Sequence, residues 1–241
     1  MSIRQVSLIA LLALLPLSSS YGETRLDMAA IVKEVEILKN VDSAMTMVMW
    51  MPEEYWRAAI QSTGKLTDKG ADEFLKAMRP YTMFAVLAAD TGAMGAFTYS
   101  SPDQLRKNIK LEDSAGAFYE PLDPQTLNGS MKNLLQLLRP ILTNAMGPMG
   151  TNMEIVLFPA TTKAGTRIAD ATRDGYFIVH LNGLPFRYHL PLGSILPAVV
   201  DAHSGESFPG NYHFNPFTGD KLVPAPVPVP ATVAAPAASG P

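Results

Sequence analysis

The chain contains no cysteine among its 241 residues, and this absence limits how it can be stabilised. Disulfide bonds, iron–sulfur clusters, thiol catalysis and cysteine-based zinc sites are all excluded. The fold must therefore depend on a hydrophobic core, and a content of 47% hydrophobic and 17% charged residues is suited to one. We expect a globular chain that is held together by packing rather than by crosslinks.

The first 22 residues have the composition of a secretory signal peptide. Arg4 supplies the positive charge, residues 6–17 are almost entirely apolar, and residues 20–22 form a small-x-small cleavage site. The apolar run is shorter than the about 20 residues that a membrane span needs. We therefore expect cleavage before Glu23 and a secreted or periplasmic protein without a transmembrane segment.

Charge and composition also bear on the partners of the chain. The formal net charge of −3 argues against nucleic-acid binding, which needs a basic surface to neutralise phosphates. Residues 224–241 contain only Pro, Ala, Val, Thr, Ser and Gly, which predicts a disordered Pro/Ala-rich tail. The partner therefore stays open between an envelope protein and a small ligand.

Short segments with helical or alternating hydrophobic spacing follow one another along residues 23–198. Helices are predicted at residues 26–40, 52–64, 67–78, 101–108 and 123–146. Strands are predicted at residues 44–51, 81–89, 95–100, 117–119, 152–158, 176–181 and 186–190, the last two joined by Asn182 and Gly183 in a type I′ turn. Because the strands form hairpins rather than regular βαβ units, we expect an α+β fold with a mainly antiparallel sheet, several helices and a small C-terminal ribbon-like β module.

Two C-terminal segments, residues 201–206 and 215–220, share the pattern x-x-x-[ST]-G-[DE]. Each resembles the C-P-x-C-G knuckle of rubredoxin-like zinc ribbons, with both cysteines replaced. The glycines of the knuckles remain, as Gly205 and Gly219, while the four cysteine positions hold Asp201, Ser204, Asn215 and Thr218. The resemblance implies a degenerate, metal-free ribbon packed around Phe208, Tyr212, Phe214 and Leu222. An unrelated pair of glycine turns and a rebuilt cation or histidine site are the alternatives.

A longer stretch, residues 50–222, resembles a group of uncharacterised, exported bacterial proteins. The resemblance lies in MPEEYW at 51–56, RPYT at 79–82, GPMG at 147–150, LFPA at 157–160 and LPLGSILP at 190–197. It implies export and a shared fold, but no activity. The predicted organisation is a signal peptide at 1–22, an α+β domain at 23–198, the degenerate ribbon at 199–223 and the tail at 224–241.

Two sets of side chains are weak candidates for metal binding. His180 and His189 flank the Asn182-Gly183 turn and could meet across the hairpin, although surface histidines are the commoner explanation. Met45, Met47, Met49 and Met51 alternate along a strand, so their thioethers would share one face and could bind Cu(I). Methionine is also an ordinary filler of hydrophobic cores, which is the simpler interpretation.

No catalytic motif is present. G-x-S-x-G, H-E-x-x-H, Walker A and G-x-G-x-x-G are all missing, and the adjacent acids Glu53 and Glu54 are explained as charges at the start of a helix. These observations favour a non-catalytic binding or scaffolding module of the cell envelope, with no catalytic residue and no cofactor. A hydrolase whose site assembles only in three dimensions and a copper binder that uses the methionines stay open.

Overall fold

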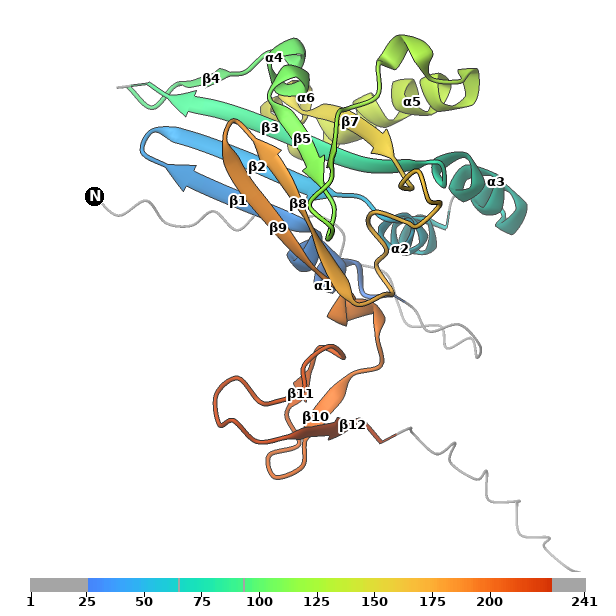
Figure 1. Ribbon diagram of the computed structural model, residues 1–241, viewed down its shortest axis with the longest axis vertical. Coiled ribbons are helices and arrows are strands. Elements are labelled where there is room, and N and C mark those ends of the chain that lie inside the picture. The colour runs from blue at the N-terminus through green and yellow to red at the C-terminus, as the bar shows by residue number, and fades with distance from the viewer. Residues whose placement is uncertain (1–25, 65, 93, 227–241) are drawn as a thin grey trace, which may run out of the picture. The chain divides into compact units, whose positions relative to one another are not determined.

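The computed structural model describes residues 26–226 apart from residues 65 and 93, so the predicted signal peptide and most of the predicted tail lie outside the described residues. In this part of the chain there are six α-helices and three antiparallel sheets, which confirms the predicted α+β class (Figure 1). Contacts divide the chain after Ile195 into a large unit and a small C-terminal unit.

The first sheet of the large unit is built around β3 (Tyr81–Thr91). On one side of β3 lie β2 (Ala44–Trp50) and then β1 (Glu36–Val41), while β4 (Phe97–Tyr99) and β7 (Glu154–Pro159) also pair with β3. All of these pairs are antiparallel. Residues 46–50 and 82–89 are buried on both faces of the sheet, so β2 and β3 form the centre of the core.

The second sheet has the strand order β6-β5-β8-β9. Its strands are β5 (Ile109–Glu112), β6 (Phe118–Tyr119), β8 (Gly175–Leu181) and β9 (Leu184–Leu190). Positive φ angles of 53° at Asn182 and 77° at Gly183 form the predicted tight turn between β8 and β9. Buried and more exposed residues alternate along β8, so one face of this sheet packs inward.

An aromatic core joins the two sheets. Trp50 of β2 packs edge-on against Phe177 of β8, with 4.9 Å between the ring centroids. Phe177 stacks on Tyr188 of β9 at 4.8 Å, and the Tyr188 hydroxyl donates a hydrogen bond of 2.9 Å to the carbonyl oxygen of Val48. Such aromatic pairs contribute about 0.5–1.5 kcal/mol each beyond their burial. They fix the position of Trp50, which also lines the pocket described below.

The helices are α1 (Met28–Val35), α2 (Glu53–Thr63), α3 (Asp68–Met78), α4 (Pro102–Lys107), α5 (Gly129–Met146) and α6 (Pro148–Asn152). Single residues set several of their ends. The Thr67 side chain accepts a hydrogen bond from the Gly70 N–H at the start of α3, and Gly64 ends α2 in the left-handed conformation. Among the described residues, no helix is both long and apolar enough to cross a membrane.

Two predicted helix boundaries are wrong. Residues 36–40, the last third of the helix predicted at 26–40, belong to β1, because this strand pairs along its whole length with β2. This pairing outweighs the helical spacing of the segment. Asp123 caps only a 3₁₀ turn (Pro124–Thr126), and α5 begins later, where the Asn128 side chain accepts a hydrogen bond from the Met131 N–H.

The small unit is a three-stranded sheet with two similar turns. β10 (Val199–Asp201) lies between β11 (Ser207–Phe208) and β12 (Leu222–Pro224). In the turns, the N–H of Gly205 donates to the carbonyl oxygen of Asp201, and the N–H of Gly219 donates to that of Asn215, each at 2.8 Å. Both glycines have positive φ angles, 71° and 80°, which side chains other than glycine rarely adopt.

A hydrogen bond connects the two turns. Asn215 Nδ2 donates to Asp201 Oδ2 at 2.7 Å, and both side chains are buried. Asp201 Oδ1 and Asn215 Oδ1 each accept hydrogen bonds from backbone N–H groups of their own turn. The hydrogen bond from Asn215, together with those N–H groups, lowers the pKa of Asp201 to about 2.

The predicted core of this unit is only half correct. Phe208 and Leu222 are buried, whereas Tyr212 and Phe214 are exposed. The strands are two or three residues long, so the sheet has room for few core side chains.

Candidate functional site: a charged pocket at the end of β2

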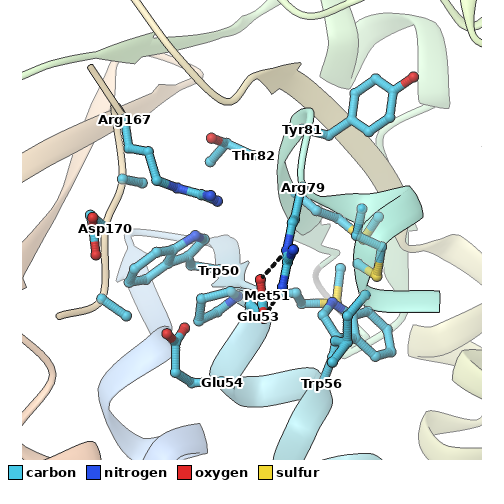
Figure 2. Close-up of a pocket in the computed structure, with 16 residues that line it drawn as sticks. Trp50, Met51, Glu53, Glu54, Trp56, Arg79, Tyr81, Thr82, Arg167 and Asp170 are labelled. Carbon is cyan, nitrogen blue, oxygen red and sulfur yellow. Dashed lines mark hydrogen bonds and ion pairs between the residues drawn. The ribbon is translucent and has the colours of Figure 1, made fainter. Parts of the chain in front are cut away.

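A pocket of about 190 Å³ lies where β2 passes into α2 (Figure 2). Its walls come from the end of β2, the first turn of α2, the end of α3, the start of β3 and the loop 167–171. Pro52 precedes α2, and the acids Glu53 and Glu54 occupy its first turn, where the helix dipole favours negative charge. The strand-to-helix junction thus places two carboxyl groups at the pocket.

Two arginines neutralise Glu53. Arg57 Nη2 donates to Glu53 Oε1 at 2.6 Å, and Arg79 Nε donates to Glu53 Oε2 at 3.2 Å. Burial raises the pKa of Glu53, but the hydrogen bonds and charges of Arg79 and Arg57 outweigh burial, so its pKa lies below the ordinary value. Glu53 is therefore ionised at neutral pH and holds the Arg79 guanidinium at the pocket (Figure 2).

Glu54 has the opposite properties, although it is the next residue. Burial raises its pKa above the ordinary value, and the negative charges of Glu53 and Asp170 add to this effect. Its own backbone N–H and the charge of Arg167 act in the opposite direction, but the pKa stays raised because burial is the largest effect. No side chain among the described residues makes an ion pair or hydrogen bond with its carboxyl group. Neighbouring acids with opposite pKa directions are typical of sites that bind or react.

The loop 167–171 contributes the remaining charges. The N–H of Ile168 donates to the Ala160 carbonyl at 3.0 Å, and the N–H of Leu192 donates to the Ala171 carbonyl at 2.9 Å. These two bonds fix the loop beside Trp50. Arg167, Asp170 and Trp50 all line the pocket, and in the view of Figure 2 the Arg167 guanidinium appears above the Trp50 indole and Asp170 to its left. Within the described residues, Arg167 has no hydrogen-bond or ion-pair partner.

Trp56 leaves a buried hydrogen-bond donor at the pocket. The residue is 9% exposed, it lines the pocket, and its indole Nε1 has no acceptor within the described part of the chain. Its ring is held by edge-on contacts with Tyr55 and Phe74, at 5.2 and 5.4 Å between centroids. A buried donor without an acceptor costs about 1–3 kcal/mol, so a molecule in the pocket that accepts this hydrogen bond would gain affinity from it.

The pocket therefore combines free donors with free acceptors. Arg167 offers N–H groups, Trp56 has a buried N–H without an acceptor, and Glu54 and Asp170 offer carboxylate oxygens. In the part of the chain that the structure describes, no group of three or more His, Cys, Asp or Glu residues is placed to hold a metal ion. The arrangement suits noncovalent recognition of a small polar molecule, and Glu54 also suits proton exchange.

The structure does not bring the two candidate histidines together. In the β8–β9 register, His180 lies opposite Pro185 and His189 lies opposite Tyr176. The two histidines are thus four residues apart along the hairpin, about 13 Å at ~3.3 Å per residue. His180 instead pairs with Glu112 of β5, with 2.6 Å between Nε2 and Oε2.

The candidate methionines lie in and beside the core. Met47, Met49 and Met51 are buried, and Met45 is partly buried at the start of β2. The residues between them are buried too, so β2 is a central strand rather than a half-buried one. The thioethers fill core space there. Copper binding by Met45, Met47 and Met49 stays a prediction, which a Cu(I) titration of the triple Leu variant tests.

Sequence reasoning missed most of this site. It explained Glu53 and Glu54 as helix-end charges and assigned no role to Trp56, Arg167 or Asp170. One signal pointed to the place, because MPEEYW at 51–56 and RPYT at 79–82 both line the pocket.

Comparisons with protein-family models, with curated proteins and with solved structures found no match to this chain.

Proposed function

We propose that this protein is a non-catalytic binding protein whose pocket at the end of β2 takes a small molecule with an anionic group. The observation that carries the proposal is the buried Trp56 Nε1, a donor without an acceptor among the described residues, on a side chain that lines the pocket. Buried donors in proteins are almost always satisfied, and a bound molecule would satisfy this one. The free Arg167 guanidinium above the pocket supplies the positive charge that an anionic group needs.

Calorimetric titration of the mature protein with small carboxylates, amino acids, inorganic phosphate and neutral sugars tests the proposal. A hydrogen bond to a charged group contributes about 1.5–3 kcal/mol, so Arg167→Gln should weaken binding about 10- to 150-fold. Trp56→Phe keeps the ring, removes the donor and should cost about 2- to 10-fold. Arg187→Gln is the matched control, because Arg187 stacks on Tyr176 and does not line the pocket.

Two results would contradict the proposal. One is that no member of the panel binds. The other is that a ligand binds the wild type, Arg167→Gln and Trp56→Phe equally well, which would place its site elsewhere.

A hydrolase is the second candidate, and the raised pKa of Glu54 favours it. A carboxyl group with a raised pKa in a pocket can donate a proton to a leaving group. Turnover of esters, peptides or glycosides by the wild type, lost in Glu54→Gln but kept in the exposed control Glu73→Gln, would establish this activity and replace the binding proposal.

The proposed location of the mature protein is the periplasm or the exterior of the cell. The signal-peptide pattern of residues 1–22 supports it. N-terminal sequencing of the protein recovered from those compartments should begin at Glu23.

A further inference from the structure

The unpaired charges at the pocket have both signs. Arg167 is a cation without a hydrogen-bond or ion-pair partner among the described residues, and the Glu54 carboxyl group makes no hydrogen bond or ion pair with a side chain there. Asp170 uses Oδ1 to accept hydrogen bonds from the backbone N–H and the hydroxyl of Thr172, at 3.1 and 2.7 Å. Its other carboxylate oxygen is left for a ligand. A molecule that satisfies all three residues must itself carry a negative and a positive group.

We propose that the ligand is a zwitterion of the amino-acid class, with its carboxylate on Arg167 and its ammonium group held by Glu54 and Asp170. This inference rests on the binding function proposed above and names the class of ligand. In Figure 2 the indole of Trp50 lies between these groups, with Arg167 above it, Asp170 beside it and Glu54 below it.

The acids of the pocket disfavour a ligand that is only anionic. Phosphate or a dicarboxylate would meet Arg167 but would also face the charges of Glu54 and Asp170, which repel it. An ammonium group removes this repulsion, because it pairs with both carboxyl groups. The indole face of Trp50 also attracts a nearby cation.

The size of the pocket agrees with a small ligand. At about 190 Å³ the pocket is below the about 300–1,000 Å³ that is usual for drug-sized molecules. Trp50, Leu75 and Met78 contribute apolar surface to its wall, so a short aliphatic side chain has a place beside the charged groups.

The position of Glu54 in the pocket makes this binding depend on pH. Burial raises the pKa of Glu54 and the charges of Glu53 and Asp170 raise it further, while its own backbone N–H and the charge of Arg167 lower it. Protonation of Glu54 removes one partner of the ammonium group, while the ligand carboxylate stays ionised. The affinity for a zwitterion should therefore fall as the pH drops through the pKa of Glu54, and this dependence should be lost in Glu54→Gln.

The test compares alanine, propionate and ethylamine as ligands of the mature protein. Alanine carries both charges, propionate lacks the ammonium group, and ethylamine lacks the carboxylate. We expect alanine to bind at least about tenfold more tightly than either propionate or ethylamine, because each of these satisfies only one sign of charge at the pocket. Glu54→Gln and Asp170→Asn should each weaken alanine binding about tenfold without weakening propionate binding. Glu73→Gln on the exposed face of α3 should change neither affinity.

The outcomes separate this inference from the proposed function. If propionate binds as tightly as alanine and both depend on Arg167, the zwitterion is refuted and the anion site stands. If only ethylamine binds, the zwitterion and the anion site are both refuted. If alanine binds to wild type and Arg167→Gln alike, the proposed arrangement of the two charges is wrong. Circular dichroism of each variant checks that the fold is retained, so that a lost affinity can be assigned to the side chain.

Discussion

A buried ion cluster on β7 gives the sharpest test of the energetics of the large unit. Glu154, the first residue of β7, has a side chain that is 1% exposed and pairs with Arg106 of α4 and Arg139 of α5. Arg139 Nη2 lies 3.1 Å from Glu154 Oε2. The Arg106 side chain is 28% exposed and the Arg139 side chain is 53% exposed. The arginines can therefore turn to solvent, whereas the carboxylate cannot.

The informative perturbation is Arg106→Met/Arg139→Met, which keeps an unbranched apolar stem at both positions and removes both positive charges. It leaves the Glu154 carboxylate buried without a counter-ion, for which about 3–5 kcal/mol of lost stability is typical. This is a large part of the about 5–15 kcal/mol that stabilises an ordinary domain. Adding Glu154→Leu removes the buried charge as well, so the triple variant should regain most of that loss.

Urea unfolding followed by tryptophan fluorescence measures the effect, because both tryptophans, Trp50 and Trp56, belong to the large unit. With a denaturant slope of about 2 kcal/mol/M, the midpoint of the double variant should fall by about 1.5–2.5 M. Lys69→Met removes one partner of an exposed ion pair with Glu73 and should change stability by less than about 0.5 kcal/mol. A double variant that loses less than about 1 kcal/mol, or a triple variant no more stable than the double, would refute the reasoning.

Three further results are expected. Gly150→Ala should destabilise the large unit by about 1–3 kcal/mol in the same assay, since the new Cβ would lie 2.1 Å from the Leu142 carbonyl oxygen, whereas Gly129→Ala meets no atom within 4 Å and should be neutral. The depressed pKa of Asp201 provides stability above about pH 4 that is lost as the pH falls towards 2, so amide NMR signals of the two C-terminal turns should weaken over that range, and Asn215→Asp should weaken them at neutral pH. A variant with cysteine at all four knuckle positions should bind one Co²⁺ or Zn²⁺ and show thiolate absorption, whereas a variant with serine at all four should not. The four positions are those of Asp201, Ser204, Asn215 and Thr218.

Sequence patterns predict the elements whose ends depend on one residue and its immediate neighbours. Thr67 begins α3 and Gly64 ends α2, as expected from capping and left-handed glycine. Asn182 and Gly183 form the turn between β8 and β9 for the same kind of local reason. These rules involve contacts within a few residues, so a linear pattern contains the necessary information.

The same reasoning fails where a distant segment decides the conformation. Residues 36–41 have spacing compatible with a helix, but their pairing with β2 makes them a strand. The pocket shows this limit more strongly, since Glu54 and Arg167 are more than a hundred positions apart in the sequence. The backbone hydrogen bonds of Ile168 and Leu192 place Arg167 there, and neither bond leaves a periodic signal.

The resemblance of the C-terminal unit to a zinc ribbon stays a prediction, but the structure shows how two glycine turns are joined there by side chains. In a zinc ribbon, binding of the ion provides about 10–16 kcal/mol of folding free energy and joins the two knuckles. Here the join is the hydrogen bond from Asn215 to Asp201, whose energy is far smaller. The remaining stability has to come from the pairing of β10 with β11 and β12 and from the buried side chains of Phe208 and Leu222. Because a carboxylate and an amide complement each other only in one orientation, replacing either one should separate the turns while the sheet remains.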